Sequence, residues 1–206
     1  YRKVFRRCEE ARLATGYFYV SGFNLYKEEL ENLKSPEELG RAPIRILMGR
    51  ETDRFTAEEI QEGMNLRDEV EKAVDEDIDE LNNAQMERLE RLKDFIAEGL
   101  VEIRVKTPDQ GMFHAKGAAF RMPKPEDHYE GDNRPGATIV GSSNFSKSGH
   151  TKNIELNLAT REDRETEAFE DWFDSQWTNN AQEFSEELVD IIESNKQYQD
   201  WKQGRG

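Results

Sequence analysis

Apolar and polar residues follow two different periods along this chain, and the periods predict helices and strands in mixed order. Apolar positions fall at helical spacing over residues 1–13, and Asn24–Leu33 is predicted to form a short amphipathic helix. From Phe55 to Gly99, apolar residues recur at intervals of three, four or eight, which predicts a mostly helical segment with one apolar stripe. Gly99 is expected to end that segment as a C-terminal capping glycine.

Six strands and two further helices complete the predicted order. The strands are expected at Ala14–Phe23, Ile44–Met48, Val101–Lys106, Met112–Met122, Ala137–Ser142 and Asn153–Thr160. Glu165–Asn179, with aromatic residues on one face, and Ser185–Ser194 are predicted helices. This order predicts an α/β fold in which helices flank a mixed β-sheet, an α-β-α sandwich. We expect one domain over residues 1–180, followed by a C-terminal helix and polar tail over residues 181–206.

Composition narrows the class of protein. The 206 residues carry a net charge of −15, which by itself argues against a nucleic-acid partner. The distribution of charge along the chain weakens that objection. Residues 51–100 have a net charge of −11, whereas residues 101–160 have a net charge of +1. The single cysteine, Cys8, excludes an intrachain disulfide and a cysteine metal cage, and is interpreted as a packing residue. No apolar run approaches the roughly 20 residues of a membrane-spanning helix.

Chemistry-bearing residues are concentrated in the near-neutral part of the chain. Three strand-like segments each carry two polar residues at a spacing of two: His114 and Lys116, Ser142 and Asn144, and Asn153 and Glu155. In a strand, residues i and i+2 point to the same face. Such a face would be suited to binding and attacking a phosphate ester. It would combine a base or nucleophile, a fixed cation, neutral hydrogen-bond donors and a carboxylate.

The order His-x-Lys, Gly-Ser-x-Asn and Asn-x-Glu resembles the signature of the phospholipase D superfamily. Further similarity extends through residues 16–23 (GYFYVSGF), 44–53 (IRILMGRETD) and 141–157 (GSSNFSKSGHTKNIELN). These segments look like the phospholipase-D-like domain that is fused to superfamily 2 helicases in bacteria. The resemblance covers roughly residues 14–195.

The resemblance assigns a role to each motif residue. His114 is implied to be the nucleophile that forms a phosphohistidine, and Lys116 to neutralise the phosphate oxygens. Asn144, with Ser142, is implied to donate hydrogen bonds to the same oxygens, and Glu155 to orient the imidazole of His114. Further substrate-binding candidates are Ser143, Asn153 and Arg50. The alternative interpretation of Arg50 is an ordinary surface arginine.

One position departs from the signature. The family's aspartate is expected at position 121, five residues after Lys116, and this chain has Arg121 there. The departure counts against lipid hydrolysis. It leaves two further classes open, an active nuclease and a catalytically weak or inactive module that binds phosphate or DNA and dimerises.

The resemblance also implies partners. The family's reaction uses two half-sites and this chain carries one, so a homodimer with a shared site is expected. No metal or cofactor is required by the implied chemistry. The expected partners are nucleic acid, with DNA favoured over RNA, and a downstream helicase domain. Membrane association is not expected, and the expected location is the cytoplasm. The favoured function is a metal-independent nuclease or DNA-end-processing domain, with a phospholipid phosphodiesterase as the weaker alternative.

Overall fold

A computed structural model describes residues 2–16, 30–49, 66–106, 113, 115–124, 135–142 and 156–204. The described strands are β1 (Glu10–Thr15), β2 (Ile44–Met48), β3 (Val101–Lys106), β4 (Gly117–Arg121), β5 (Gly136–Gly141), β6 (Asn157–Thr160) and β7 (Ala181–Glu183). They form one seven-stranded sheet in the order β6-β5-β4-β1-β2-β3-β7. β1, β2 and β3 are parallel neighbours, and every other pair is antiparallel, so the sheet is mixed.

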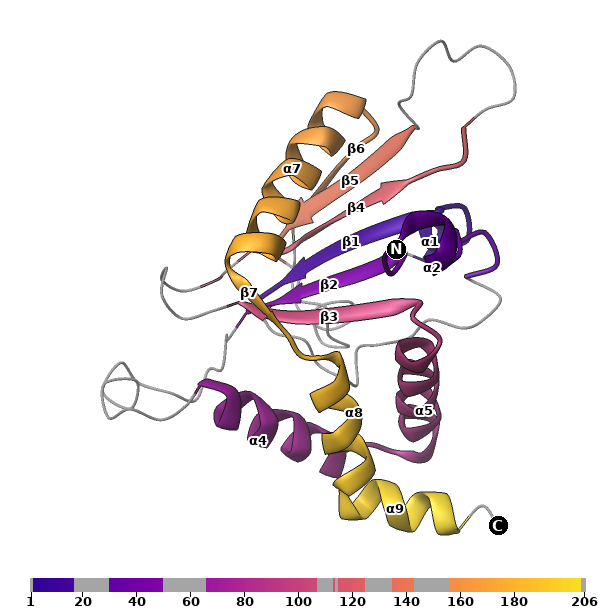
Figure 1. Ribbon diagram of the computed structural model, residues 1–206, viewed down its shortest axis with the longest axis vertical. Coiled ribbons are helices and arrows are strands. Elements are labelled where there is room, and N and C mark those ends of the chain that lie inside the picture. Colours follow the sequence, from indigo (N-terminus) through magenta and orange to yellow (C-terminus); the bar gives the residue numbers. More distant parts are fainter. Residues whose placement is uncertain are drawn as a thin grey trace.

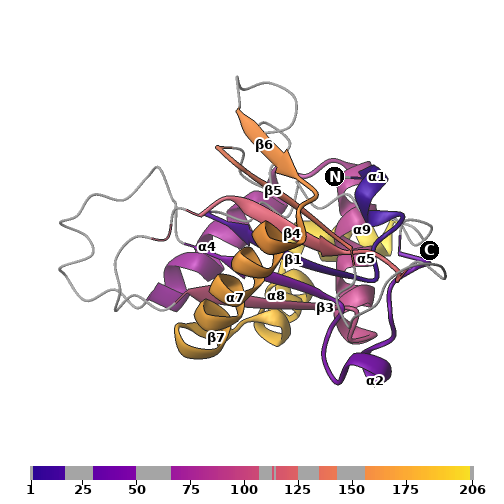
Figure 2. The same ribbon diagram turned by 90° about the horizontal axis from the view of Figure 1, so that it is seen from above.

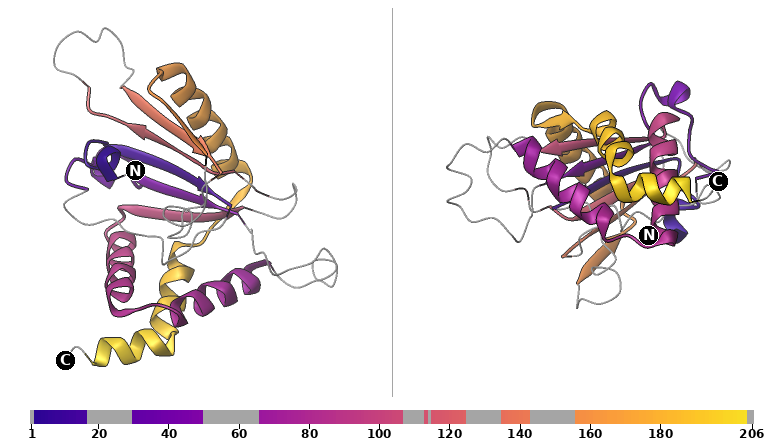
Figure 3. Two further views of the ribbon diagram at one scale, coloured as in Figure 1. Left: turned by 180° about the vertical axis from the view of Figure 1, so that it is seen from behind. Right: turned by 90° about the horizontal axis from the view of Figure 1, so that it is seen from below.

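Helices cover both faces of this sheet. They are α1 (Arg2–Phe5), α2 (Pro36–Leu39), α4 (Leu66–Asp79), α5 (Asn83–Ala97), α7 (Asp163–Asn179), α8 (Ser185–Ser194) and α9 (Lys196–Gln203). Helix α7 lies on one face, and α4, α5, α8 and α9 gather on the other (Figures 1, 2 and 3). The α-β-α sandwich expected from the sequence is therefore confirmed.

The two faces bury different amounts of apolar surface. The face toward α4, α5 and α8 holds the main core, in which Phe5 meets Phe120 edge to face with ring centroids 5.1 Å apart. The face toward α7 holds a smaller cluster formed by Ala14, Leu47, Phe113, Phe173 and Trp177. All six residues of β1 are buried, because the strand lies in the middle of the sheet with helices on both sides.

The helix predicted over residues 1–13 is wrong beyond its first turn. Only Arg2–Phe5 is helical, and Glu10–Thr15 is the central strand β1, four residues ahead of the strand predicted to begin at Ala14. A short run that is buried on every side has no strand alternation, so its period does not separate strand from helix. The remainder of the predicted strand, and most of the helix predicted over Asn24–Leu33, lie outside the described residues.

The described part of the mostly helical segment, residues 66–99, contains the two helices α4 and α5. Asn82 caps α5 by accepting from the backbone of Gln85, whose side chain accepts from the backbone of Asn82 in return, and this capping box separates α5 from α4. Gly99 has a φ of 72°, the left-handed conformation expected of a glycine that follows a helix. Residues 55–65 of the predicted helix lie outside the described residues.

Two further predictions need correction near the ends of elements. β4 begins at Gly117, so the strand predicted over Met112–Met122 is shorter, and Phe113, Ala115 and Lys116 precede it. The polar tail after Ser194 contains a helix, α9, in which Tyr198 is buried against the main core. A single buried aromatic in a polar segment gives too weak a period to predict that helix.

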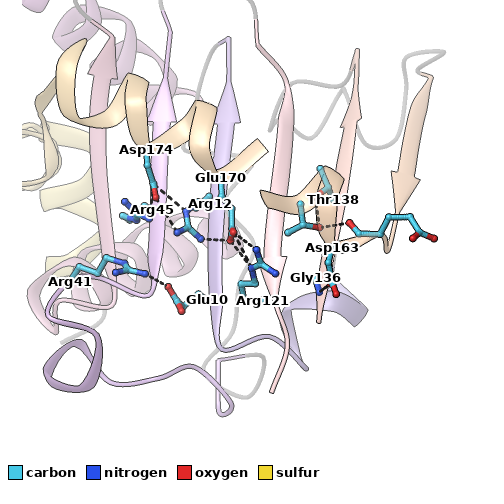
Figure 4. A network of polar contacts seen from close by, with 12 residues as sticks. Glu10, Arg12, Arg41, Arg45, Arg121, Gly136, Thr138, Asp163, Glu170 and Asp174 are labelled. Atoms are coloured by element: carbon cyan, nitrogen blue, oxygen red, sulfur yellow. Dashed lines mark hydrogen bonds and ion pairs between the residues drawn. The ribbon is translucent and has the colours of Figure 1, made fainter. Parts of the chain in front are cut away.

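A buried ion-pair network joins α7 to three adjacent strands (Figure 4). Arg121 of β4 donates from Nε to both carboxylate oxygens of Glu170 at 3.0 Å, and Arg12 of β1 donates to the same carboxylate at 2.5 Å. One helical turn later, Asp174 accepts from Arg12 at 3.2 Å and pairs with Arg45 of β2 at 2.9 Å. The network fixes which strands α7 crosses.

Arg45 shows the electrostatic cost of this arrangement. Burial lowers the pKa of Arg45, the neighbouring charge of Arg12 lowers it further, and Asp174 opposes both effects. The network places three guanidinium groups over two carboxylates, so neither acid is expendable.

Glu170→Ala is expected to lower the free energy of unfolding by about 3–5 kcal/mol, because it leaves Arg12 and Arg121 buried without that carboxylate. Asp171→Ala, at an exposed position of the same helix, is the matched control and should change stability by no more than about 0.5 kcal/mol. Urea unfolding of both variants measures the difference. Equal, small losses would show that Glu170 does not hold the helix.

Cys8 is fully buried, as its interpretation as a packing residue requires. Burial raises the pKa of its thiol from 9.0 to about 12. The unfolded chain therefore releases this proton at lower pH than the folded chain, and the stability that depends on it is complete below pH 9.0 and declines above.

Iodoacetamide at pH 8 should label Cys8 only in denaturant, as measured by mass spectrometry. Rapid labelling of the folded protein would contradict this burial.

Candidate active site

The strand directions bring the three sequence motifs to one edge of the sheet. β1, β2 and β3 end at this edge, and because β4 is antiparallel to β1, it begins there, with Gly117 beside Ala14. β5 is antiparallel to β4 and ends at the same edge, and β6 begins there with Asn157 beside Gly141. The segments before β4, after β5 and before β6 are those that carry the His-x-Lys, Gly-Ser-Ser-Asn and Asn-Ile-Glu motifs.

Hydrogen bonds connect the three motif segments directly. The backbone N–H of Gly141 donates to the carbonyl of Lys116 at 3.1 Å, which joins the first motif to the second. The N–H of Ser142 donates to the carbonyl of Leu156 at 3.1 Å, and the N–H of Leu156 donates to the Ser142 hydroxyl at 3.1 Å. Ser142 thus ties the second motif to the residue that follows Glu155. Lys116 is half-buried and Ser142 is exposed.

Most of the predicted site residues lie outside the described residues. This holds for His114, Asn144 and Glu155, and for the candidate substrate ligands Ser143, Asn153 and Arg50. Among them, His114 has both of its neighbours, Phe113 and Ala115, described. The described members are Lys116 and Ser142. The i, i+2 arrangement predicted for each pair therefore stays a prediction.

Aromatic packing anchors the His-x-Lys segment to helix α7. Phe113 is 8% exposed and stacks on Trp172 with ring centroids 6.0 Å apart. Ala115 packs against the same cluster from the other side of position 114. The aromatic residues of α7 thus hold the residues on both sides of the candidate nucleophile.

Two glycines permit close backbone approaches at this edge. A Cβ on Gly49 would lie 2.6 Å from the carbonyl oxygen of Phe113 and 2.9 Å from that of Gly16. A Cβ on Gly141, the first residue of Gly-Ser-Ser-Asn, would lie 2.4 Å from the carbonyl oxygen of Leu156. Both positions need a residue without a side chain, because the motif segments pass directly over them.

Arg121 lies at the opposite edge of the sheet. It is the last residue of β4, five residues after Lys116, which corresponds to about 17 Å of strand. Its guanidinium is buried under α7 on Glu170. Its exchange for the signature aspartate therefore changes an interior ion pair and removes no group from the motif edge.

The structure adds Lys106 to the residues at the motif edge. It is the last residue of β3, and its side chain is 6% exposed. Its alternating segment predicts a polar residue at this position. Its burial was not predictable, because β7 and the end of α7, which flank it, come about 70 residues later in the chain.

Within the described ranges, no three His, Cys, Asp or Glu side chains are grouped as a metal-ligand set. None of the described helices combines the length and the apolar character needed to cross a membrane.

Comparisons with known proteins agree with the motif pattern. The sequence model of the family described as "Cardiolipin synthase, PLD-like domain" matches residues 7–177. No curated protein matches the chain. Among solved structures, Nuc from Salmonella typhimurium, described as a phospholipase D family member, is 14% identical over 88% of this chain and 86% of its own, with a TM-score of 0.43.

Two other structures are similar at comparable levels. NucT from Helicobacter pylori is 13% identical, with a TM-score of 0.40 over 86% of this chain and 85% of NucT. Phosphatidylserine synthase from Haemophilus influenzae Rd KW20 is 13% identical, with a TM-score of 0.49 over 98% of this chain and 40% of the synthase.

Gly49→Ala is expected to lower the free energy of unfolding by about 1–3 kcal/mol, because its methyl group would overlap the backbone at Phe113. Gly204→Ala is the matched control, since its Cβ would meet its nearest atom at an ordinary 3.5 Å. Urea unfolding of the two variants measures the difference. Equal losses would show that a side chain is tolerated at this close approach.

Proposed function

Because this chain belongs to the phospholipase D-like domain family, we propose that it is a metal-independent phosphodiesterase acting on nucleic acid, with DNA favoured over RNA. The observation that carries the proposal is the hydrogen bond from Gly141 to Lys116. It holds the His-x-Lys and Gly-Ser-Ser-Asn segments together at one edge of the sheet. A cation and backbone or amide donors next to each other are what a phosphate group requires.

The proposed reaction has two steps. In the first, an imidazole nitrogen of His114 forms a bond to phosphorus while the bond to the leaving oxygen breaks, giving a phosphohistidine. In the second, water attacks phosphorus and the N–P bond breaks. Lys116 and Asn144 stabilise the charge on the phosphate oxygens, and Glu155 orients the imidazole.

A second imidazole is needed to protonate the leaving oxygen. His114 of the partner subunit would supply it in a homodimer with twofold symmetry. The proposal thus requires two copies of the chain for one complete site.

The position of Arg121 supports a catalytically active domain over a non-catalytic one. An aspartate at the far end of β4 would lie about 17 Å from Lys116 along the strand and could not touch the same phosphate. The exchange therefore leaves the groups proposed to act on the phosphate in place. The main alternative is a module that binds phosphate or DNA without hydrolysing it.

A downstream helicase region is a separate proposal. It depends on the sequence resemblance to helicase-fused domains, with residues 181–206 leading toward that region. The rest of the reading frame tests it directly, through the presence or absence of helicase motifs.

The wild-type protein is expected to cleave labelled single- or double-stranded DNA in the presence of EDTA, and His114→Ala should abolish cleavage by removing the nucleophile. His128→Ala, at a position outside the three motifs of the sequence, is the matched control and should retain activity. Gel electrophoresis of the products measures both. Cleavage that requires a divalent metal, or that survives His114→Ala, would contradict the mechanism.

Two further outcomes separate the alternative functions. Hydrolysis of phosphatidylcholine or cardiolipin vesicles without action on DNA would favour the phospholipid phosphodiesterase. DNA binding without any cleavage would favour the non-catalytic module.

Mixing wild-type protein with an equal amount of His114→Ala, after subunit exchange, tests the shared site. If both imidazoles are needed, only wild-type pairs act, and the activity per total protein falls to about one quarter. Independent sites would retain about one half. A strict monomer that cleaves DNA at full rate would contradict the dimer.

A further inference from the structure

Lys106 is a buried cation with no hydrogen-bond partner among the described residues. Its side chain is 6% exposed, and its Nζ is shielded from solvent. Among the residues that the structure describes, none forms a hydrogen bond with this ammonium group. Its neighbour Arg104, two residues earlier on the same strand, shows the usual solution by pairing with Glu102 at 2.9 Å and donating to the carbonyl of Trp177 at 3.1 Å.

An unpaired buried ammonium is costly, because the protein has removed it from water without giving it a compensating acceptor. The chain has no shortage of acids, with 44 Asp and Glu against 29 Lys and Arg. The buried arginines of the same face have carboxylate partners, as Arg45 has in Asp174. Lys106 differs from them in its position, since it ends a strand at the motif edge. Among the described residues, its ammonium is therefore available to an anion from outside the chain.

The position of Lys106 separates it from the phosphate site of Lys116. β1 and β2 lie between β3 and β4, so the two backbones are three strand spacings apart, about 14 Å. Lys106 also shares a sheet face with Arg104, which lies over the ring of Trp177 at 4.6 Å. Residues of β4 with the parity of Lys116, such as Ala118 and Phe120, face the main core on the opposite side. One phosphate group therefore does not serve both lysines.

We infer that Lys106 binds a second phosphate of a nucleic-acid strand, next to the phosphate that is cleaved. The inference depends on the proposed function, because it assumes that a polynucleotide crosses the motif edge. Lys106 has a flexible four-carbon stem at the end of a strand, and can turn toward that edge. Turning outward replaces an unpaired buried state with a charge-assisted contact to a phosphate oxygen, so the anion itself provides the driving force.

The test measures binding separately from cleavage. In the His114→Ala background, binding of a short single-stranded oligonucleotide is titrated at several salt concentrations for Lys106, Lys106→Met and Lys106→Arg. Loss of one phosphate contact should reduce the slope of log K against log salt by about 0.7 to 1 in Lys106→Met, equally for different sequences. Lys106→Arg should keep the slope. Lys72→Met, an exposed lysine on α4, should leave it unchanged.

Unfolding measurements distinguish a binding role from a structural one. If the ammonium lacks a partner in the free protein, Lys106→Met should unfold at a urea concentration equal to or above that of the parent. A lower midpoint, or failure of Lys106→Met to fold, would overturn the inference by showing that the chain itself pairs Lys106. An unchanged salt slope, or no oligonucleotide binding by the parent, would also overturn it.

Other ligands and the reaction itself provide the remaining controls. Dependence on Lys106 that is seen with anionic phospholipid vesicles and not with the oligonucleotide would overturn the nucleic-acid assignment. DNA cleavage by the wild type combined with an unchanged slope would mean that the function holds and the role of Lys106 fails. A reduced slope without cleavage would mean that the role of Lys106 holds and the nuclease function fails.

Discussion

The arrangement around the motifs depends on the ion pairs that the carboxylate of Glu170 forms. This carboxylate accepts from Arg12 of the central strand and from Arg121 of the next strand, and so sets where α7 crosses the sheet. Buried ion pairs contribute little net stability compared with apolar packing, but breaking one is costly, and they can specify a single arrangement. Once α7 is placed, its aromatic residues meet Phe113 and hold the segment that carries the first motif. The chemistry at one edge of the sheet therefore depends on ion pairs in its interior.

This dependence gives Arg121 a meaning that differs from its position in a motif. Viewed as a signature residue, it is an acid exchanged for a base. In the fold it is a strand-end arginine whose charge is balanced by a carboxylate of a helix that begins some 40 residues later. Sequence motifs combine residues that act on a substrate with residues that hold the backbone. The spacing along a strand tells these two kinds of residue apart. Five residues of strand are longer than a phosphate group, so residues that far apart do not both contact one phosphate.

The charge pattern is likewise organised by the sheet. Helix α4 carries seven acidic and two basic residues and lies on the face opposite α7, which itself carries six acidic residues and one basic residue. The buried arginines and Lys106 lie under α7, on its side of the sheet. We propose that the motif edge of this acidic protein meets a polyanion. Lys106 and Lys116 reach that edge from different strands and different faces. A surface of this kind fits an extended strand of phosphates better than a single compact anion.

The sequence by itself determined the strands β2, β3 and β5 nearly to their ends, the helices α7 and α8, and the set of three motifs, because each depends on local periodicity or on residue types at short spacing. It also determined the α/β class, since that follows from the order of elements. Only the tertiary structure decided that residues 10–15 are a central strand, that Arg121 is an interior ion-pairing residue, and that Lys106 is buried with no hydrogen-bond partner in the described part of the chain. These three facts depend on contacts with segments far along the chain. Glu170 and strand β7 lie far along the chain from the residues that they contact. The local sequence around those residues therefore does not predict the contacts.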